Sequence, residues 1–356
     1  MRSFLLFSAL VLFAGTVYPV SAAEVKQQQQ TTTKQTVDKD KAKAKAKAKA
    51  DAKAKAPAKA KAAAKSTAKA KAKSKSKSKS KRATKAAALA AAESVNADSG
   101  ADHSDPYPKA AAAYAVAVDD QIIYGRKVDT PRPPASLTKV LSALVILDHN
   151  WQPDDAVLVS PRAAGMEGSR IGLRKGDSVR AGDLLTAMIV RSGNDACMAM
   201  AEHVGGSEEG FVKLMNQKAQ AIGMASSSFR NPCGLDADGH LSTARDLLTL
   251  ARVADHQSEI SWRANAKQAQ FRTLNTNRRI SFRNTNAMLG TQPETVGLKT
   301  GFTNKAGKCL IALAEHGAHK VWVVLLHSPN RWGTAKQLLA RGASHADRPA
   351  ASLAQP

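Results

Sequence analysis

One stretch decides the fold: residues 137–148 read LTKVLSALVILD. Val140, Leu141 and the run 143–147 make a helix built from this stretch apolar nearly all round. Such a helix belongs in the interior of a sizeable domain, because a surface helix would keep a polar face. We therefore expect a buried central helix against which the other elements pack.

Strand-like patterns lie on both sides of this helix, at the two ends of the part of the chain with apolar patterns. Residues 111–118 and 121–124 flank the turn signal Asp119-Asp120, as in a β-hairpin. Helical patterns follow, and strand patterns return near the C-terminal end. This order indicates an α+β fold, in which an antiparallel sheet is built from both ends of the domain around a mostly helical insertion. The predicted helices cover 183–190, 195–204, 211–222, 246–254 and 331–340, and the later strands cover 296–300, 308–315 and 320–327.

The charge of the chain is concentrated before the expected domain. The 356 residues carry a formal net charge of +24, but residues 34–85 contain 21 Lys or Arg and three acidic residues, which alone amounts to +18. Lys alternates there with Ala or Ser, which places charge on every side of a helix and leaves no apolar face to pack. We expect a disordered tail over 24–105, a folded domain over 106–345 and a short C-terminal tail over 346–356.

Residues 1–23 are typical of a secretory signal peptide. Arg2 precedes the apolar run 4–13, and small residues lead to an expected cleavage after Ala22 or Ala23. The alternative is an uncleaved N-terminal anchor. We expect the protein to be exported to the periplasm or the cell envelope. The basic tail would meet little nucleic acid there, so anionic envelope polymers or membrane surfaces are its expected partners, with a solubilising linker as the alternative.

The chain has three cysteines: Cys197, Cys233 and Cys309. An odd and scattered set of this size does not indicate a disulfide framework. Buried, small apolar side chains are the simplest expectation. One pair can oxidise in an exporting compartment, and the sequence leaves open which pair that would be.

Ser136 and Lys139 lie one helical turn apart at the start of the central helix. This Ser-x-x-Lys spacing places both side chains on one face. A serine hydroxyl is a poor nucleophile unless a base takes its proton, and a lysine amine can do so where burial or a second cation lowers its pKa. In isolation the pattern is very common, and a capping Ser beside a solvated Lys is then the better explanation.

A second motif, Ser192-Gly193-Asn194, lies between two predicted helices. The Ser192 hydroxyl could relay a proton, and the Asn194 amide could contact both a lysine and a substrate amide. By itself the motif is no more than a loop signal.

A third motif, KTGFT at Lys299–Thr303, lies on a predicted strand. Gly301 removes a side chain where a substrate backbone could lie along the strand edge. Thr300 and Thr303 offer hydroxyls, and Lys299 offers a charge, to a substrate carboxylate. A plain edge strand is the alternative.

The three motifs, in this order, resemble the set of the serine penicillin-binding enzymes, in particular the small D-alanyl-D-alanine carboxypeptidases and endopeptidases. The resemblance covers about residues 110–340 and implies a β-lactamase/transpeptidase-like fold. One departure is Cys233, where relatives usually have His, which leaves the role of that side chain open. Other stretches that resemble sequences of this family are 168–177, 182–185, 231–235, 242–246 and 282–286.

The resemblance implies acyl transfer on the stem peptides of peptidoglycan. Ser136 would attack the carbonyl between two D-alanines with Lys139 as general base, and Ser192 with Lys299 would return the proton to the leaving amine. β-Lactam antibiotics would acylate Ser136 as covalent inhibitors, and no cofactor or metal is expected. The amides of Ser136 and Phe302 would form the oxyanion hole. The substrate-binding residues implied are Asn194, Lys299, Thr300, Gly301, Phe302 and Thr303.

Other functions fit parts of the sequence. A class A-like β-lactamase shares the motifs, but its Glu-x-x-Leu-Asn string is absent, and Glu208 begins a helix instead. An inactive envelope protein that binds polyanions fits the tail. A metallopeptidase would need Asp236, Asp238 and His240, which are better explained as a solvated turn. Carboxypeptidase and endopeptidase specificity both stay open, with carboxypeptidase as the general assignment.

Overall fold

The computed structural model describes residues 104–291 and 295–348. The chain divides into two units, Met1–Ala92 and Glu93–Pro356, and every described residue belongs to the second. The predicted signal peptide, nearly all of the predicted basic tail and residues 349–356 lie outside the described residues.

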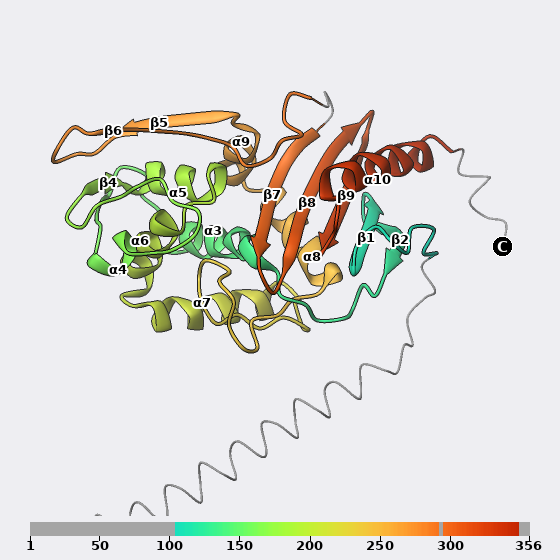
Figure 1. Cartoon of the computed structure of the whole chain (residues 1–356), viewed down its shortest axis with the longest axis horizontal. Helices are drawn as coiled ribbons and strands as arrows, with labels where there is room; N and C mark the ends of the chain where they lie inside the picture. The colour runs from blue at the N-terminus through green and yellow to red at the C-terminus, as the bar shows by residue number, and fades with distance from the viewer. Residues whose placement is uncertain (1–103, 292–294, 349–356) are drawn as a thin grey trace, which may run out of the picture. The chain divides into compact units, whose positions relative to one another are not determined.

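A five-stranded antiparallel sheet lies at the centre of the second unit, in the order β2-β1-β9-β8-β7 (Figure 1). The first strand of the domain pairs with the last one, from Ala113 opposite Leu326 to Val118 opposite Val321. The prediction of an antiparallel sheet built from both ends is therefore confirmed. The strands are β1 (Ala113–Val118), β2 (Gln121–Arg126), β7 (Thr295–Thr303), β8 (Gly307–His316) and β9 (His319–Leu326).

The central strands are buried on both faces, which explains their nearly continuous apolar sequence. Successive side chains of a strand point to opposite faces. In β9, Val323 packs with Leu338 of α10 (Arg331–Ala346), whereas Val324 packs in the larger cluster that contains Leu141 and Leu247. Figure 1 shows α10 lying across one face of the sheet, with α8 behind the strands.

The central helix is confirmed as buried. It is α3 (Thr138–Asp148), and its residues from Thr138 to Ile146 are all buried. A short 3₁₀ turn, η1 (Ala135–Leu137), precedes it and contains Ser136, which therefore lies one turn before the α-helix proper. The other predicted helices are α5 (Ala181–Val190), α6 (Asn194–Gly205), α7 (Glu208–Ala221) and α8 (Ala244–Asp255).

Several short elements were not predicted from the sequence. In addition, α10 ends six residues beyond its predicted end. In the β5–β6 hairpin, Phe271 opposite Ile280 is buried, while Gln270 opposite Ser281 is exposed. This alternation is a strand signal, but it covers only five residues in each strand. The elements missed are β3 (Ala156–Leu158), β4 (Ser178–Arg180), α4 (Pro161–Ala164), α9 (Ser258–Asn265), β5 (Gln268–Arg272) and β6 (Arg279–Arg283).

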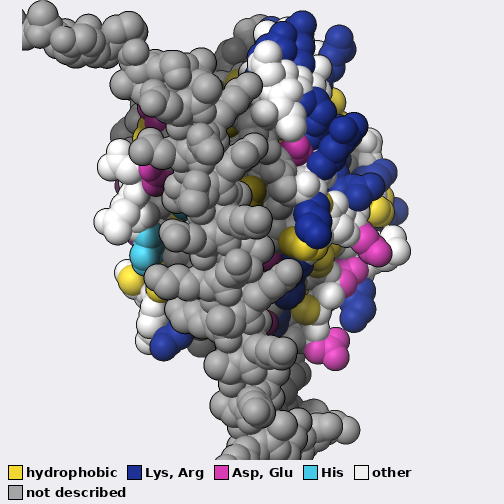
Figure 2. Space-filling view, turned by 90° about the vertical axis from the view of Figure 1, so that its left-hand side faces the viewer, with side chains coloured by type: hydrophobic (Ala, Val, Ile, Leu, Met, Phe, Trp, Pro, Cys, Tyr) yellow, Lys and Arg dark blue, Asp and Glu magenta, His cyan; other side chains and the backbone are white. Residues whose placement is uncertain are grey.

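The β5–β6 hairpin makes part of the surface basic. In Figure 2, Lys and Arg side chains gather along one side of the visible face of the molecule. Residues 260–291 contain no Asp or Glu, and the hairpin exposes Lys267, Arg272, Arg279 and Arg283. Among the described residues, no helix has the length and apolar character needed to cross a membrane.

Candidate active site

Ser136 lies in a turn that is closely packed on two sides. The preceding residue, Ala135, has a φ of 51°, which is uncommon for a residue with a side chain. A Cβ added to Gly301 of β7 would lie 3.1 Å from Ser136 N, and one added to Gly234 would lie 2.0 Å from the Ala135 carbonyl oxygen. The strand β7 and the loop between α7 and α8 therefore hold Ser136 in place by direct backbone contact.

Glycine at position 301 has a packing role that the sequence did not indicate. We expected Gly301 to leave room for a substrate backbone along the strand edge. A side chain at this position would also point at the turn that contains Ser136, because the nearest atoms to an added Cβ belong to Pro134, Ala135 and Ser136. Gly301 thus brings β7 close to Ser136.

Replacing Gly234 by Ala is expected to displace the nucleophile turn. Gly234 and Gly223 have similar φ values of 79° and 84°, so Ala at either position costs about 1–2 kcal/mol in backbone strain. Only at Gly234 would the new Cβ overlap other backbone atoms, since nothing lies within 4 Å of one at Gly223. We expect Gly234→Ala to slow the acylation of Ser136 by a fluorescent penicillin about 100-fold.

Gly223→Ala is the matched control, and its acylation rate should stay near that of the wild type. Stopped-flow labelling of both variants measures the difference. Equal rates in the two variants would show that the contact between Gly234 and the nucleophile turn does not matter.

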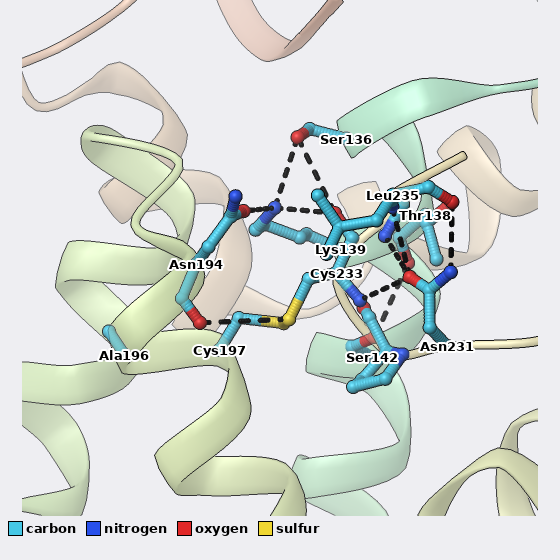
Figure 3. The surroundings of a disulfide bond; sticks show 12 residues. Ser136, Thr138, Lys139, Ser142, Asn194, Ala196, Cys197, Asn231, Cys233 and Leu235 are labelled. Atoms are coloured by element: carbon cyan, nitrogen blue, oxygen red, sulfur yellow. Dashed lines mark hydrogen bonds between the residues drawn. A yellow bond between two sulfur atoms is a disulfide. The ribbon is translucent and has the colours of Figure 1, made fainter. Parts of the chain in front are cut away.

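The Lys139 amine lies beside Ser136 and is surrounded by oxygen atoms. Its Nζ is 3.0 Å from Ser136 Oγ, 2.7 Å from Asn194 Oδ1 and 2.6 Å from the carbonyl oxygen of Cys233 (Figure 3). The side chain is fully buried, and none of these three oxygens belongs to a carboxylate. A buried amine with neutral partners favours the uncharged form.

The electrostatics of the site lower the pKa values of both motif lysines. Burial lowers the pKa of Lys139 well below its usual value, the charge of Lys299 lowers it further, and Asp195 partly opposes the shift. Burial, together with the positive charge of Arg331, lowers the pKa of Lys299 to about 7. Lys299 is therefore a second cation that lowers the pKa of Lys139, as a lysine base requires. A neutral Lys139 in contact with Ser136 can accept its proton.

The rate of acylation should therefore fall as the pH is lowered and Lys139 becomes protonated. Lys299 is charged mainly below its pKa of about 7, where its charge opposes protonation of Lys139. Removing that charge in Lys299→Met raises the pKa of Lys139, so the acidic limb of the pH–rate profile should move to higher pH. The position of the limb is the readout, because the variant also loses overall rate.

Lys305→Met is the control for this prediction. Lys305 is an exposed residue between β7 and β8 that pairs with Asp238. Its removal should leave the acidic limb where it is in the wild type. If the acidic limb of the pH–rate profile has the same position in Lys299→Met as in the wild type, Lys299 does not affect the pKa of Lys139.

The second motif forms the turn between α5 and α6. Ser192 has a φ of 62° and is 5% exposed, and its hydroxyl makes no hydrogen bond to any residue within the described ranges. Asn194, the first residue of α6, accepts from Lys139 through Oδ1 and donates from Nδ2 to the carbonyl oxygen of Glu167 at 2.5 Å. The expected contact between Asn194 and a lysine is present, and Ser192 precedes Asn194 by two positions in the same turn.

Asp195 also belongs to this site, although the sequence analysis did not single it out. Its buried carboxylate accepts backbone N–H bonds from Ile171, Gly172 and Leu173 at 3.0–3.1 Å. It thereby fixes the loop before β4 to the start of α6. An acidic residue in the first turn of a helix was the available signal, but it is common to many helices.

The third motif lies on β7, an edge strand of the five-stranded sheet. The Thr300 hydroxyl is 2.6 Å from that of Thr285, and Thr303 donates to Asp236 Oδ1 at 2.6 Å. Phe302 is 59% exposed. Lys299 is buried and donates to the carbonyl oxygen of Thr300. The structure thus brings the three motifs together, with Thr300 and Thr303 already hydrogen-bonded to protein groups.

The residues considered for a metal site have other partners, and His240 is not part of a solvated turn. His240 is 2% exposed, and its Nε2 is 2.8 Å from Thr138 Oγ1. Its Nδ1 accepts from the backbone N–H of Arg230, which fits a neutral ring, and burial lowers its pKa to about 4. Among the described residues, no group of three or more His, Cys, Asp or Glu is placed so that it could hold a metal ion.

The loop between α7 and α8 supplies an acceptor that the sequence analysis missed. Asn231 Oδ1 accepts from the backbone N–H groups of Cys233, Gly234 and Leu235 at 2.8–3.2 Å. This turn directs the carbonyl oxygen of Cys233 at Lys139. A backbone carbonyl has no side-chain signature, so only the turn residues Asn231 and Gly234 could have indicated it.

Comparisons with known proteins show the family of the chain. A family model described as D-alanyl-D-alanine carboxypeptidase matches residues 101–330. The chain is 36% identical over 201 residues to the D-alanyl-D-alanine carboxypeptidase DacF of Bacillus subtilis, a match that covers 55% of this chain and 51% of that protein. It is 31% identical over 227 residues to a D-alanyl-D-alanine endopeptidase of Pseudomonas aeruginosa, covering 62% and 73% respectively. The match thus spans about half the length of the first relative.

Solved structures give the same fold. The Streptomyces K15 DD-transpeptidase superposes with a TM-score of 0.64 at 26% sequence identity, over 68% of this chain and 99% of that one. The D-alanyl-D-alanine carboxypeptidase DacD of Francisella tularensis gives a TM-score of 0.59 at 28% identity, over 66% and 70%. The β-lactamase/transpeptidase-like fold expected from the three motifs is confirmed.

Proposed function

The chain belongs to the D-alanyl-D-alanine carboxypeptidase family, and from that premise we propose that it is a serine DD-peptidase. Its substrates would be the stem peptides of peptidoglycan, cleaved at D-Ala-D-Ala bonds or at D-Ala-linked cross-bridges. The observation that carries this proposal is the contact of 3.0 Å between Ser136 Oγ and the buried Lys139 Nζ. A serine beside an uncharged amine is equipped for acyl transfer.

The acylation step follows from this contact. Ser136 Oγ attacks the carbonyl carbon between the two D-alanines while its proton passes to Lys139. The C–N bond then breaks, and the leaving amine takes up a proton that Lys139 supplies through Ser192 and Lys299. Water attacks the ester afterwards, which releases the shortened peptide and restores the Ser136 hydroxyl.

The edge strand β7 offers the substrate a binding site. A peptide can add to such an edge through main-chain hydrogen bonds, and β7 passes directly beside Ser136. The Lys299 charge and the hydroxyls of Thr300 and Thr303 would receive the carboxylate of the substrate, which requires the hydroxyls to exchange their present partners. Backbone amides of Ser136 and Phe302 would stabilise the oxyanion, at about 3–4 kcal/mol per donor.

Where the enzyme works depends on residues outside the described ranges. Residues 1–23 have the features of a signal peptide, so export to the periplasm or envelope is part of the proposal. The Lys/Ala-rich segment would then hold the enzyme near anionic envelope polymers. A salt-dependent association of the full chain with isolated envelopes, lost on deleting residues 24–103, would test this part.

Muropeptide analysis tests the proposed activity. The purified protein is incubated with pentapeptide monomers and with cross-linked dimers, and the products are separated and weighed by mass spectrometry. Release of free D-alanine from monomers would establish the carboxypeptidase reaction, and conversion of dimers to monomers the endopeptidase reaction. No change in either substrate would overturn the proposal. Rapid turnover of nitrocefin would favour the β-lactamase alternative instead.

A further inference from the structure

A disulfide bond lies directly behind the Ser136–Lys139 pair. It joins Cys197 on α6 to Cys233 in the loop between α7 and α8, 36 positions apart in the sequence, with a Cα–Cα distance of 5.9 Å. Both residues are 1% exposed, while Cys309 is free and buried elsewhere. Figure 3 shows the two sulfur atoms between the α6 helix and the loop, next to Lys139. The bond therefore ties together two segments that both reach the active site.

The same two segments carry the hydrogen-bond acceptors of Lys139. Asn194, which accepts through Oδ1, begins the helix three residues before Cys197. The other acceptor is the main-chain carbonyl oxygen of Cys233 itself. The disulfide thus links the two segments that carry the acceptors. A shift of α6 relative to the loop would move one acceptor away from the Lys139 amine.

The number of these acceptors matches the chemistry of a neutral amine. An uncharged Lys amine has two N–H donors and one lone pair. If the N–H groups donate to Asn194 Oδ1 and to the Cys233 carbonyl oxygen, the lone pair is left for the Ser136 hydroxyl, 3.0 Å away. The two acceptors thereby orient the base as well as hold it.

We propose that the Cys197–Cys233 disulfide is a positioning element, which holds the two acceptors of Lys139 so that its lone pair faces Ser136. The inference deepens the proposed function and rests on it. Without the bond, the loop at Cys233 can move away from α6, the amine can rotate, and water can reach it. The other charged groups that act on Lys139, Lys299 on β7 and Asp195 on α6, would stay in place.

The variant Cys197→Ala/Cys233→Ala tests the proposal. Its acylation by a fluorescent penicillin should be about 10- to 100-fold slower than in the wild type, since small displacements of a base have effects of this size. The acidic limb of the pH–rate profile should also move to higher pH, because water around Lys139 weakens the lowering of its pKa by burial. With long incubation the variant should still reach full labelling, since Ser136 is intact.

Cys309→Ala is the matched control, because it removes a buried sulfur without removing a cross-link. It should leave both the acylation rate and the position of the acidic limb unchanged. The melting temperature of each variant is measured separately. All rates are then compared at a temperature well below the lowest of these melting temperatures. A double variant that melts earlier but acylates at the wild-type rate with an unmoved limb would overturn the proposal, because the bond would then contribute only to stability.

Reduction of the wild type provides a second route if the double variant does not fold. Dithiothreitol reduces the disulfide to two thiols and is itself oxidised to its cyclic disulfide, and alkylation followed by mass spectrometry counts the thiols formed. The reduced protein should show the same slower acylation and moved limb, and reoxidation should restore both. Unchanged kinetics in fully reduced protein would contradict the proposal. A wild type that no penicillin labels would instead overturn the proposed function, so the two failures are distinguishable.

Discussion

Ser136→Ala is expected to abolish covalent labelling by a fluorescent penicillin. The hydroxyl that contacts Lys139 at 3.0 Å is the atom that would form the acyl bond. Removing the nucleophile of a serine hydrolase costs a factor of about 10⁶ in kcat, so D-alanine release from a pentapeptide should fall to the level of the buffer. Gel fluorescence and mass spectrometry measure the two effects.

Ser258→Ala is the control for this loss. Ser258 is an exposed serine at the start of α9, so its removal should leave labelling and hydrolysis at wild-type levels. The melting temperature of Ser136→Ala should stay close to that of the wild type, because the Ser136 hydroxyl has few partners. Undiminished labelling of Ser136→Ala would contradict the assignment of Ser136 as the nucleophile.

Lys139→Met is expected to lower the acylation rate by a factor of about 10² to 10⁴, the usual range for the loss of a general base. Met fills most of the space of the buried Lys139 side chain but has no amine. The variant leaves Asn194 Oδ1 and the Cys233 carbonyl oxygen without their donor, at about 1–3 kcal/mol for each unsatisfied group. Its melting temperature should therefore fall as well.

Lys139→Arg separates the loss of the base from the loss of charge. A guanidinium stays protonated at every accessible pH and cannot accept the Ser136 proton. The Arg variant should therefore acylate as slowly as Lys139→Met, and raising the pH should not rescue it. Recovery of the rate at high pH in either variant would show that another group serves as the base.

The elements that carry strong patterns could be predicted from the sequence. The apolar stretch 137–148 indicated the buried helix α3, and the apolar runs at both ends indicated the antiparallel sheet. The motifs at Ser136, Ser192 and Lys299 indicated a candidate site, and the fold brings these motifs together. Each of these features depends on side chains, which a sequence displays directly.

The parts that could not be predicted depend on backbone contacts and on pairing in space. The Cys233 carbonyl oxygen contacts Lys139, yet any residue could supply that atom. Three cysteines allow three pairings, and only the packing of α6 against the following loop brings Cys197 next to Cys233. The approach of Gly301 on β7 to Ala135 is likewise a long-range contact that no local pattern indicates.

Peptide mapping of the penicillin-treated protein tests the central claim most directly. The purified wild type is acylated, digested with a protease and analysed by tandem mass spectrometry. We predict a single penicilloyl adduct, on the peptide that contains Ser136 and on that residue. An adduct on Ser192 or on any other residue, or no adduct at all, would contradict the account.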